Sequence, residues 1–255
     1  MAIEKYLQAL ESRVAPLERV IELFAASLEE PKLRHHEIGF RYDAPDIRHF
    51  CLIKAVRVVS ALNASFELAR KGYTQEVATL MRTLVDGGRQ IEYVLDSDDS
   101  EEHRSNVQKL VREFFEDSGR DSEAEIKSVL VRDKVINEQL GKTLDKIAAQ
   151  HGDTRNRVPA KELFFKTSRT YSLYVHSRYP ECMVYGGRPG RFHVRGMSGT
   201  PKDGENLEQL EVFVTVANTT FILMVQGLNL RALVDSDPML AEWHRNWFDS
   251  KRSPD

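Results

Sequence analysis

The sequence predicts an all-α protein, a bundle of roughly eight helices with one glycine-rich loop. Three observations favour this class. Most segments place apolar residues at spacings of three and four, the period of an amphipathic helix. Caps, prolines and glycines divide these segments into lengths typical of helices. Strand-like alternation of apolar and polar residues is scarce. We expect an N-terminal helix over residues 1–30, a bundle domain over 46–250 and a disordered tail over 251–255.

The N-terminal segment, residues 1–30, carries a heptad pattern held for more than three repeats. Pro16 has no amide hydrogen, so it is expected to kink this helix or split it in two. A polar, broken connection follows over 31–45. Two interpretations of the heptad seam stay open: a dimer zipper, or the inner edge of a helix packed within the bundle, which is the commoner case. The seam comprises Ile3, Leu7, Leu10, Val14, Leu17, Ile21, Phe24 and Leu28.

The next two helices are predicted to form an antiparallel hairpin. Asp46 is expected to be the N-cap of a long helix that continues to Lys71, and Gly72 ends it. Thr74 is expected to cap the following helix, which continues to about Leu95. Because the connection is so short, the two helices should pack side by side.

The remaining elements follow from the same signals. An acidic connection precedes a helix near 103–117, and Ser118-Gly119 interrupts the chain before a long helix over 122–150. Proline opens and closes the segment that follows. The expected elements after that point are a helix over 159–180, a glycine-rich loop over 185–204, a helix over 206–233 and a final helix that starts at Asp237-Pro238.

Composition excludes several classes of protein. The 255 residues carry a formal net charge of −3, so there is no global basic field for nucleic acid, and RNA or DNA contact would be local. No signal peptide is visible, and no DNA sequence-specific motif is present. The most apolar run, Val212–Val225, is too short and too rich in threonine for a membrane span and predicts a buried helix. Two distant cysteines, Cys51 and Cys182, favour a reducing cytoplasm. We expect no metal and no cofactor.

One stripe of side chains in the 159–180 helix has the chemistry of a catalytic site. Arg169, Ser172 and His176 recur at spacings of three and four, so they share a helix face. Guanidinium suits phosphate, and imidazole suits proton transfer near neutral pH. Seven helical steps leave Arg169 and His176 about 20° apart around the axis but about 10 Å apart along it. A two-fold dimer would bring the arginine of one chain near the histidine of the other. The alternative is an ordinary buried polar network.

The R-x6-H spacing of Arg169 and His176 resembles the signature of the HEPN superfamily, whose helical members act in toxin, antiviral and abortive-infection systems. The resemblance implies a metal-independent endoribonuclease with an active site formed across a dimer. His176 would transfer the proton, and Arg169 would hold the scissile phosphate. The products would be a 2′,3′-cyclic phosphate and a free 5′-hydroxyl.

A second polar stripe lies on the helix that follows Thr74. Arg82, Asp86, Arg89 and Tyr93 recur at spacings of four, three and four, which allows Asp86 to pair with both arginines. Two mid-helix glycines, Gly87-Gly88, cost about 1 kcal/mol each relative to alanine, so they predict close approach of another helix.

The segments Met81–Asp86 and Tyr171–His176 are also similar to a bacterial family of helical proteins of unknown function. That family pairs an Arg-x3-acidic helix with a later Tyr/Ser…His helix. The resemblance implies that Arg82 and Asp86 support His176, whose pKa a nearby aspartate would raise. An ion-pair network inside the bundle is the structural alternative.

The loop over 185–204 is locally basic, with aromatic residues interleaved. Arg188, Arg191, His193 and Arg195 suit RNA or a phosphorylated ligand, and the loop is able to act as a lid over the Arg169 helix. The alternative is a mobile surface connection.

The resemblance to the HEPN superfamily implies a homodimeric ribonuclease in stress or phage defence. The alternatives are a non-catalytic adaptor or regulator, and a binder of a phosphorylated small molecule.

Overall fold

The computed structural model describes residues 2–33, 40–116, 193–200 and 207–249. The predicted all-α class is confirmed: helices account for most of the described chain, and two strands of two residues each form the only sheet in it. The described helices are α1 (Ala2–Ser12), α2 (Ala15–Ala26), α3 (Ile47–Arg70), α4 (Thr74–Val94), α5 (Glu101–Glu116), α9 (Leu207–Gly227), α10 (Arg231–Asp235) and α11 (Pro238–Asp249).

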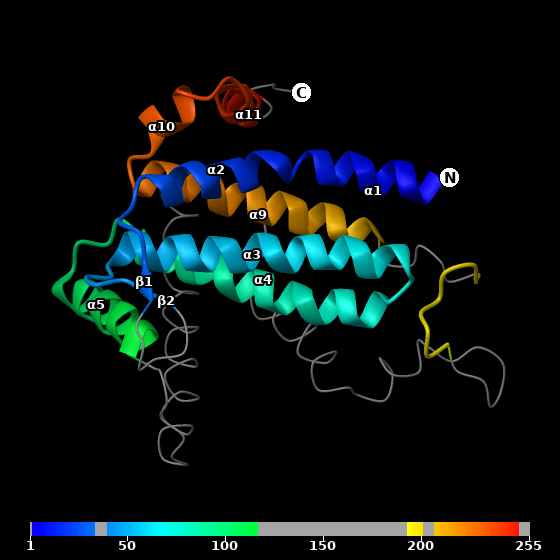
Figure 1. Ribbon diagram of the computed structural model, residues 1–255, viewed down its shortest axis with the longest axis horizontal. Coiled ribbons are helices and arrows are strands. Elements are labelled where there is room, and N and C mark those ends of the chain that lie inside the picture. The colour runs from blue at the N-terminus through cyan, green and yellow to red at the C-terminus, as the bar shows by residue number, and fades with distance from the viewer. Residues whose placement is uncertain (1, 34–39, 117–192, 201–206, 250–255) are drawn as a thin grey trace, which may run out of the picture.

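The bundle is built around the long helices α3, α4 and α9. Figure 1 shows α3 and α4 running antiparallel side by side, as the short connection predicts, with α9 packed along both. The N-terminal pair α1 and α2 covers α3 and α9 on the side away from α4. The C-terminal helices α10 and α11 close the far side against α2, and α5 packs against α3.

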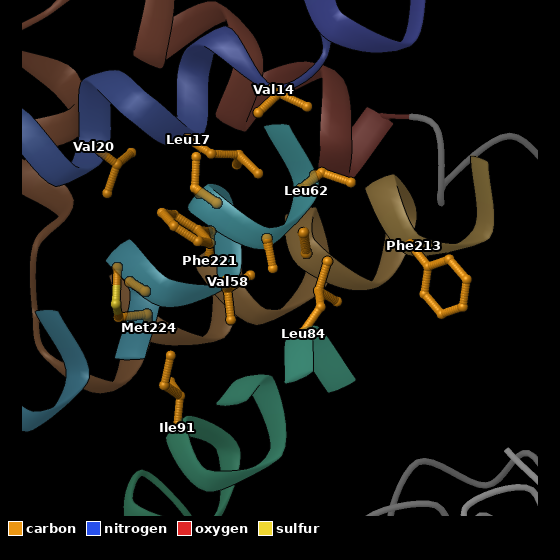
Figure 2. Close-up of a cluster of buried hydrophobic side chains, with 14 of the residues drawn as sticks. Val14, Leu17, Val20, Val58, Leu62, Leu84, Ile91, Phe213, Phe221 and Met224 are labelled. Atoms are coloured by element: carbon orange, nitrogen blue, oxygen red, sulfur yellow. The ribbon is translucent and has the colours of Figure 1, made fainter. Parts of the chain in front are cut away.

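The hydrophobic core fills the space between these helices. Figure 2 shows apolar side chains from the four walls α2, α3, α4 and α9 converging on one cluster. Burying a side chain of this size contributes about 1.5–3 kcal/mol, so the cluster is the main source of the bundle's stability. Its fully enclosed members include Leu17, Val20, Val58, Leu62, Leu84, Ile91, Phe221 and Met224.

The N-terminal seam is part of this core and is not a surface zipper. The chain splits near Pro16, so that α1 ends at Ser12 and α2 begins at Ala15, as the proline predicts. The seam residues Leu7 and Leu17 are 0% exposed within a single chain. The apolar face of α1 and α2 is therefore covered by helices of the same chain. This confirms the interpretation of the seam as the inner edge of a helix packed within the bundle.

A side-chain cap fixes where α3 begins, whereas α4 begins without one. Asp46 Oδ1 accepts from the backbone N–H of Arg48 at 2.9 Å and of His49 at 3.1 Å, which confirms Asp46 as the N-cap of α3. The prediction that Thr74 caps α4 is wrong. Tyr73 occupies the N-cap position and makes no side-chain cap bond, and Thr74 is the first helical residue.

The predicted helix over 206–233 is broken in the structure. α9 ends at Gly227, Asn229 adopts a positive φ of 55°, and the amide of Leu230 donates to the carbonyl of Val225 at 2.8 Å. This is the pattern of a helix terminated by a left-handed residue. Asparagine tolerates that conformation, and the apolar periodicity that continues into α10 hid the break.

The described part of the glycine-rich loop, residues 193–200, is fixed to the turn between α3 and α4. The amide of Met197 donates to the carbonyl of Gly72 at 3.0 Å, and Met197 is 0% exposed. A Cβ on Gly196 would lie 2.0 Å from the carbonyl oxygen of Lys71, and one on Gly72 would lie 2.4 Å from the amide of Ser198. The backbone of this end of the loop therefore packs against the α3–α4 turn.

The connection over 31–45 contains a short ladder that the polar sequence does not predict. β1 (Lys32–Leu33) pairs antiparallel with β2 (Phe40–Arg41). Two-residue strands carry too little alternation to be recognised from sequence.

α9 contains the one described segment, Gln209–Gly227, that is long and apolar enough to cross a membrane, with a mean hydropathy of 1.4. More than half of it is buried inside the bundle. This agrees with the predicted buried helix.

Candidate functional site

The polar stripe on α4 is the candidate site that the described residues contain. Arg82 Nε donates to Asp86 Oδ2 at 2.6 Å, so the predicted pairing along the helix is present. The two side chains are 22% and 36% exposed, which places them at the edge of the bundle and not fully in solvent. The ion pair therefore leaves a guanidinium and a carboxylate reachable from outside.

One turn further along, the stripe continues into the bundle interior. Glu92 Oε1 accepts from Thr220 Oγ1 of α9 at 3.3 Å. Burial raises the pKa of Glu92, while the charge of Arg89 and the bond from Thr220 oppose that rise. Burial also lowers the pKa of Arg89 to about 10, against the opposing effect of Glu92 and Asp86. Arg89 remains cationic at neutral pH, but it is held in surroundings that disfavour its charge.

Two glycines allow the neighbouring helices to reach this network. A Cβ on Gly88 would lie 2.9 Å from Thr220 Oγ1, and a Cβ on Gly87 would lie 3.1 Å from Val58 Cγ2 of α3. The predicted close approach of another helix is thus confirmed twice, once by α9 and once by α3. Gly88 has the larger consequence, because the space that it leaves lets Thr220 sit beside Glu92.

Tyr93, the last member of the predicted stripe, lies in the core. It is 2% exposed and meets the ring of His103 at a centroid distance of 4.9 Å. The face of α4 that carries charge is therefore shorter than the sequence spacing indicates.

Most of the predicted catalytic and loop residues lie outside the described residues: Arg169, Ser172, His176, Arg188 and Arg191. His193 and Arg195 are described. Their loop end is held at the turn that precedes α4, through Gly72. The contact lies at the turn before the N-terminus of α4, about two to four helical turns from Arg82 and Asp86.

Sequence reasoning missed Glu92 and Thr220. Glu92 follows Arg89 by three residues, a spacing that was available as a signal. Thr220 lies within the apolar run of α9, where the sequence pattern predicts a buried helix and gives no sign of a polar partner. Only the packing of α9 against α4 shows that its hydroxyl bonds to Glu92.

The final helix, α11, is anchored by one of its tryptophans. Trp243 Nε1 donates to Asn218 Oδ1 at 2.7 Å. Trp247 lines an open groove of about 420 Å³ between the α1–α2 junction and α11, together with Arg13 and Glu242.

Neither a metal-binding cluster among the described residues nor a likeness to known proteins indicates the class of this protein. Within the described ranges, no three His, Cys, Asp or Glu side chains gather as a metal site would require. Comparison of the whole sequence with models of protein families, and of the chain with curated proteins and solved structures, found no match.

Proposed function

We propose that this protein is a metal-independent endoribonuclease of the HEPN-like kind, acting in stress or phage defence, with Arg169 and His176 as its catalytic residues. The observation that supports it best is the charged network on α4. Burial shifts the pKa values of Arg89 and Glu92 in the directions that disfavour their charged forms, and a helical bundle gains little from enclosing such groups. Charges kept under such conditions are typical of a site selected for chemistry.

The reaction needs only groups that the chain supplies. His176 takes the proton from a ribose 2′-hydroxyl, and the 2′-oxygen attacks the adjacent phosphorus. The bond from phosphorus to the 5′-oxygen breaks, and that oxygen leaves with the proton that His176 took up. Arg169 neutralises the phosphate as charge builds on it. In this proposal the α4 stripe supports the site, with Asp86 orienting His176.

The test is cleavage of a fluorescent RNA by the purified full-length chain in EDTA. Wild type should cleave, and His176→Ala and Arg169→Ala should each lose most of the rate, by about 10²-fold or more for a general base. Arg57→Ala is a matched control, because Arg57 is exposed on α3, away from the stripe. Cleavage retained in full by His176→Ala would remove this assignment.

The structure also favours a second candidate, a non-catalytic adaptor or regulator. Arg82 and Asp86 bind one another, and Glu92 and Thr220 bind one another, which is how a purely structural network behaves. This candidate predicts that Arg82→Ala lowers the melting temperature markedly while no RNA is cleaved by any variant. An unchanged melting temperature together with lost cleavage would exclude it.

A further inference from the structure

A second pocket, independent of α4, lies where α9, α10 and α11 meet. It has a volume of about 440 Å³. Val225, Gln226 and Asn229 form one wall at the end of α9. Arg231 of α10 and His244 and Phe248 of α11 form the other. The pocket therefore joins an apolar wall to a group of hydrogen-bond donors, the usual composition of a small-molecule site.

Arg231 and His244 are in direct contact in this pocket. Arg231 Nη1 lies 2.6 Å from His244 Nδ1 and 3.3 Å from His244 Nε2, so Nδ1 is the nearer ring nitrogen. A guanidinium has only donors, so Nδ1 must be the acceptor and the ring proton sits on Nε2. Burial and the Arg231 charge both lower the pKa of His244, while Asp235 opposes them, and His244 is 4% exposed. The lowered pKa of His244 favours the neutral imidazole, which keeps one N–H donor.

Arg231 has donors left over. Its Nε donates to Asp235 at 2.7 Å and its Nη1 to His244. Among the residues that the structure describes, Nη2 makes no bond. The pair with Asp235 is solvent-exposed, with side chains 58% and 47% accessible, and such pairs contribute about 0–1 kcal/mol. It therefore holds the guanidinium in place without using up its capacity for an anion.

The end of α9 would repel an anion if its carbonyls were open. The turn after α9 covers two of them: Leu230 donates to Val225 at 2.8 Å and Asn229 to Gln226 at 3.2 Å. The positive φ of Asn229 makes this turn possible. The exposed side chains of Gln226 and Asn229 add amide donors at the rim.

We propose that this pocket binds a small organic anion, whose phosphate or carboxylate group contacts Arg231 and the His244 N–H and whose apolar or aromatic body lies against Phe248 and Val225. An inorganic ion would leave the apolar wall and most of the volume unused. This site does not rest on the proposed ribonuclease activity, and none of its residues belongs to α4.

The test is calorimetric titration of the full-length chain with four probes: phenyl phosphate, benzoate, inorganic phosphate and benzyl alcohol. Phenyl phosphate or benzoate should bind, and the tighter of the two identifies the headgroup. Inorganic phosphate should bind about tenfold or more weaker, because it lacks the apolar contact. Benzyl alcohol should not bind. Absence of binding by both organic anions would overturn the proposal.

Two variants and one control complete the test. Arg231→Gln should weaken binding of the tighter organic anion by about tenfold or more, which is the range for loss of a hydrogen bond to a charged group. Phe248→Leu should weaken binding of the same organic anion and leave the affinity for inorganic phosphate unchanged. Arg57→Gln removes the same charge from exposed α3 and should leave affinity as in wild type. The assignment would be contradicted if Arg231→Gln bound the anion as tightly as wild type. It would also be contradicted if Arg57→Gln lost as much affinity as Arg231→Gln. In wild type, the tighter anion should also raise the pKa of His244, followed by NMR of its ring protons.

Discussion

A single side chain sets the start of α3, the longest of the described helices, and makes its stability depend on pH. Asp46 accepts two backbone hydrogen bonds at the N-terminus of α3, and His49 Nδ1 lies 2.7 Å from the same oxygen. Although burial alone would raise the pKa of Asp46, the bonds and charge of His49 lower it below its ordinary value. The carboxylate is therefore the form that the folded state prefers.

Asp46→Ala should lower the free energy of unfolding by about 1 kcal/mol near pH 7, the usual contribution of an N-cap. Since the folded pKa is lowered, this contribution is present above the ordinary aspartate pKa of 3.8 and is lost as pH falls through the folded value. Urea denaturation from pH 7 to pH 3 measures it. Asp46→Asn keeps a cap acceptor and should lose most of the pH dependence; a difference from alanine that persists unchanged to pH 3 would contradict this account.

At the scale of elements, three glycines allow close contacts between segments that are distant in the sequence. Gly196 and Gly72 let the loop end approach the α3–α4 turn, and Gly88 lets α9 approach α4. Each contact fixes a candidate functional group: the first holds the segment with His193 and Arg195, and the second places Thr220 beside Glu92.

Gly196→Ala should destabilise the fold by more than Gly199→Ala. Both residues have positive φ, 85° and 75°, so both substitutions carry the 1–2 kcal/mol that a left-handed residue costs. Only at Gly196 would the new Cβ meet backbone, the carbonyl oxygen of Lys71 at 2.0 Å, whereas nothing lies within 4 Å at Gly199. Chemical denaturation of both variants measures the difference. Equal losses would mean that the loop is not fixed at this turn.

Gly88→Ala should lower the free energy of unfolding by up to about 2 kcal/mol, because overfilling a packed interface costs about 1–3 kcal/mol and alanine recovers about 1 kcal/mol of helix propensity. The atom in the way is the side chain of Thr220, so adding Thr220→Ala should recover part of the loss despite removing the bond to Glu92. A double-mutant cycle by urea denaturation gives the coupling. Additive losses in the double variant would show that α4 and α9 do not meet here.

Local signals predicted the helices well and the contacts between them less well. The apolar period, Asp46 and Pro16 were sufficient to predict the all-α class, the α3 N-cap and the α1–α2 split, because each acts within a few residues. The end of α9 was missed because Asn229 stops a helix without interrupting its apolar pattern. Glu92 and Thr220 are 128 positions apart, and no local rule joins them. The Arg82–Asp86 pair was predictable because both partners lie on one helix.

At the scale of the whole molecule, the arrangement limits how two chains can associate. The heptad seam of α1 and α2 is used inside one chain, so a dimer cannot be a zipper of that face. The proposed ribonuclease nevertheless requires two chains, since the helix that the sequence predicts over 159–180 would hold Arg169 and His176 about 10 Å apart along its axis. The dimer contact must therefore come from another face.

Mixing two inactive variants tests the shared site. In a dimer of Arg169→Ala with His176→Ala, one of the two composite sites keeps both an intact arginine and an intact histidine. If subunits exchange freely, half of the dimers are mixed and each has one site of two, so about one quarter of the wild-type rate should return. The rate of RNA cleavage in EDTA measures it. A mixture as inactive as its components would contradict a site built across two chains.

The most direct measurement of the central claim is mass spectrometry of the ends that wild-type protein leaves on a defined RNA in EDTA. Attack by the 2′-oxygen predicts fragments with a 2′,3′-cyclic phosphate and a 5′-hydroxyl, and no cleavage of a strand with 2′-deoxyribose throughout. Intact RNA, or fragments with 5′-phosphate ends, would contradict it.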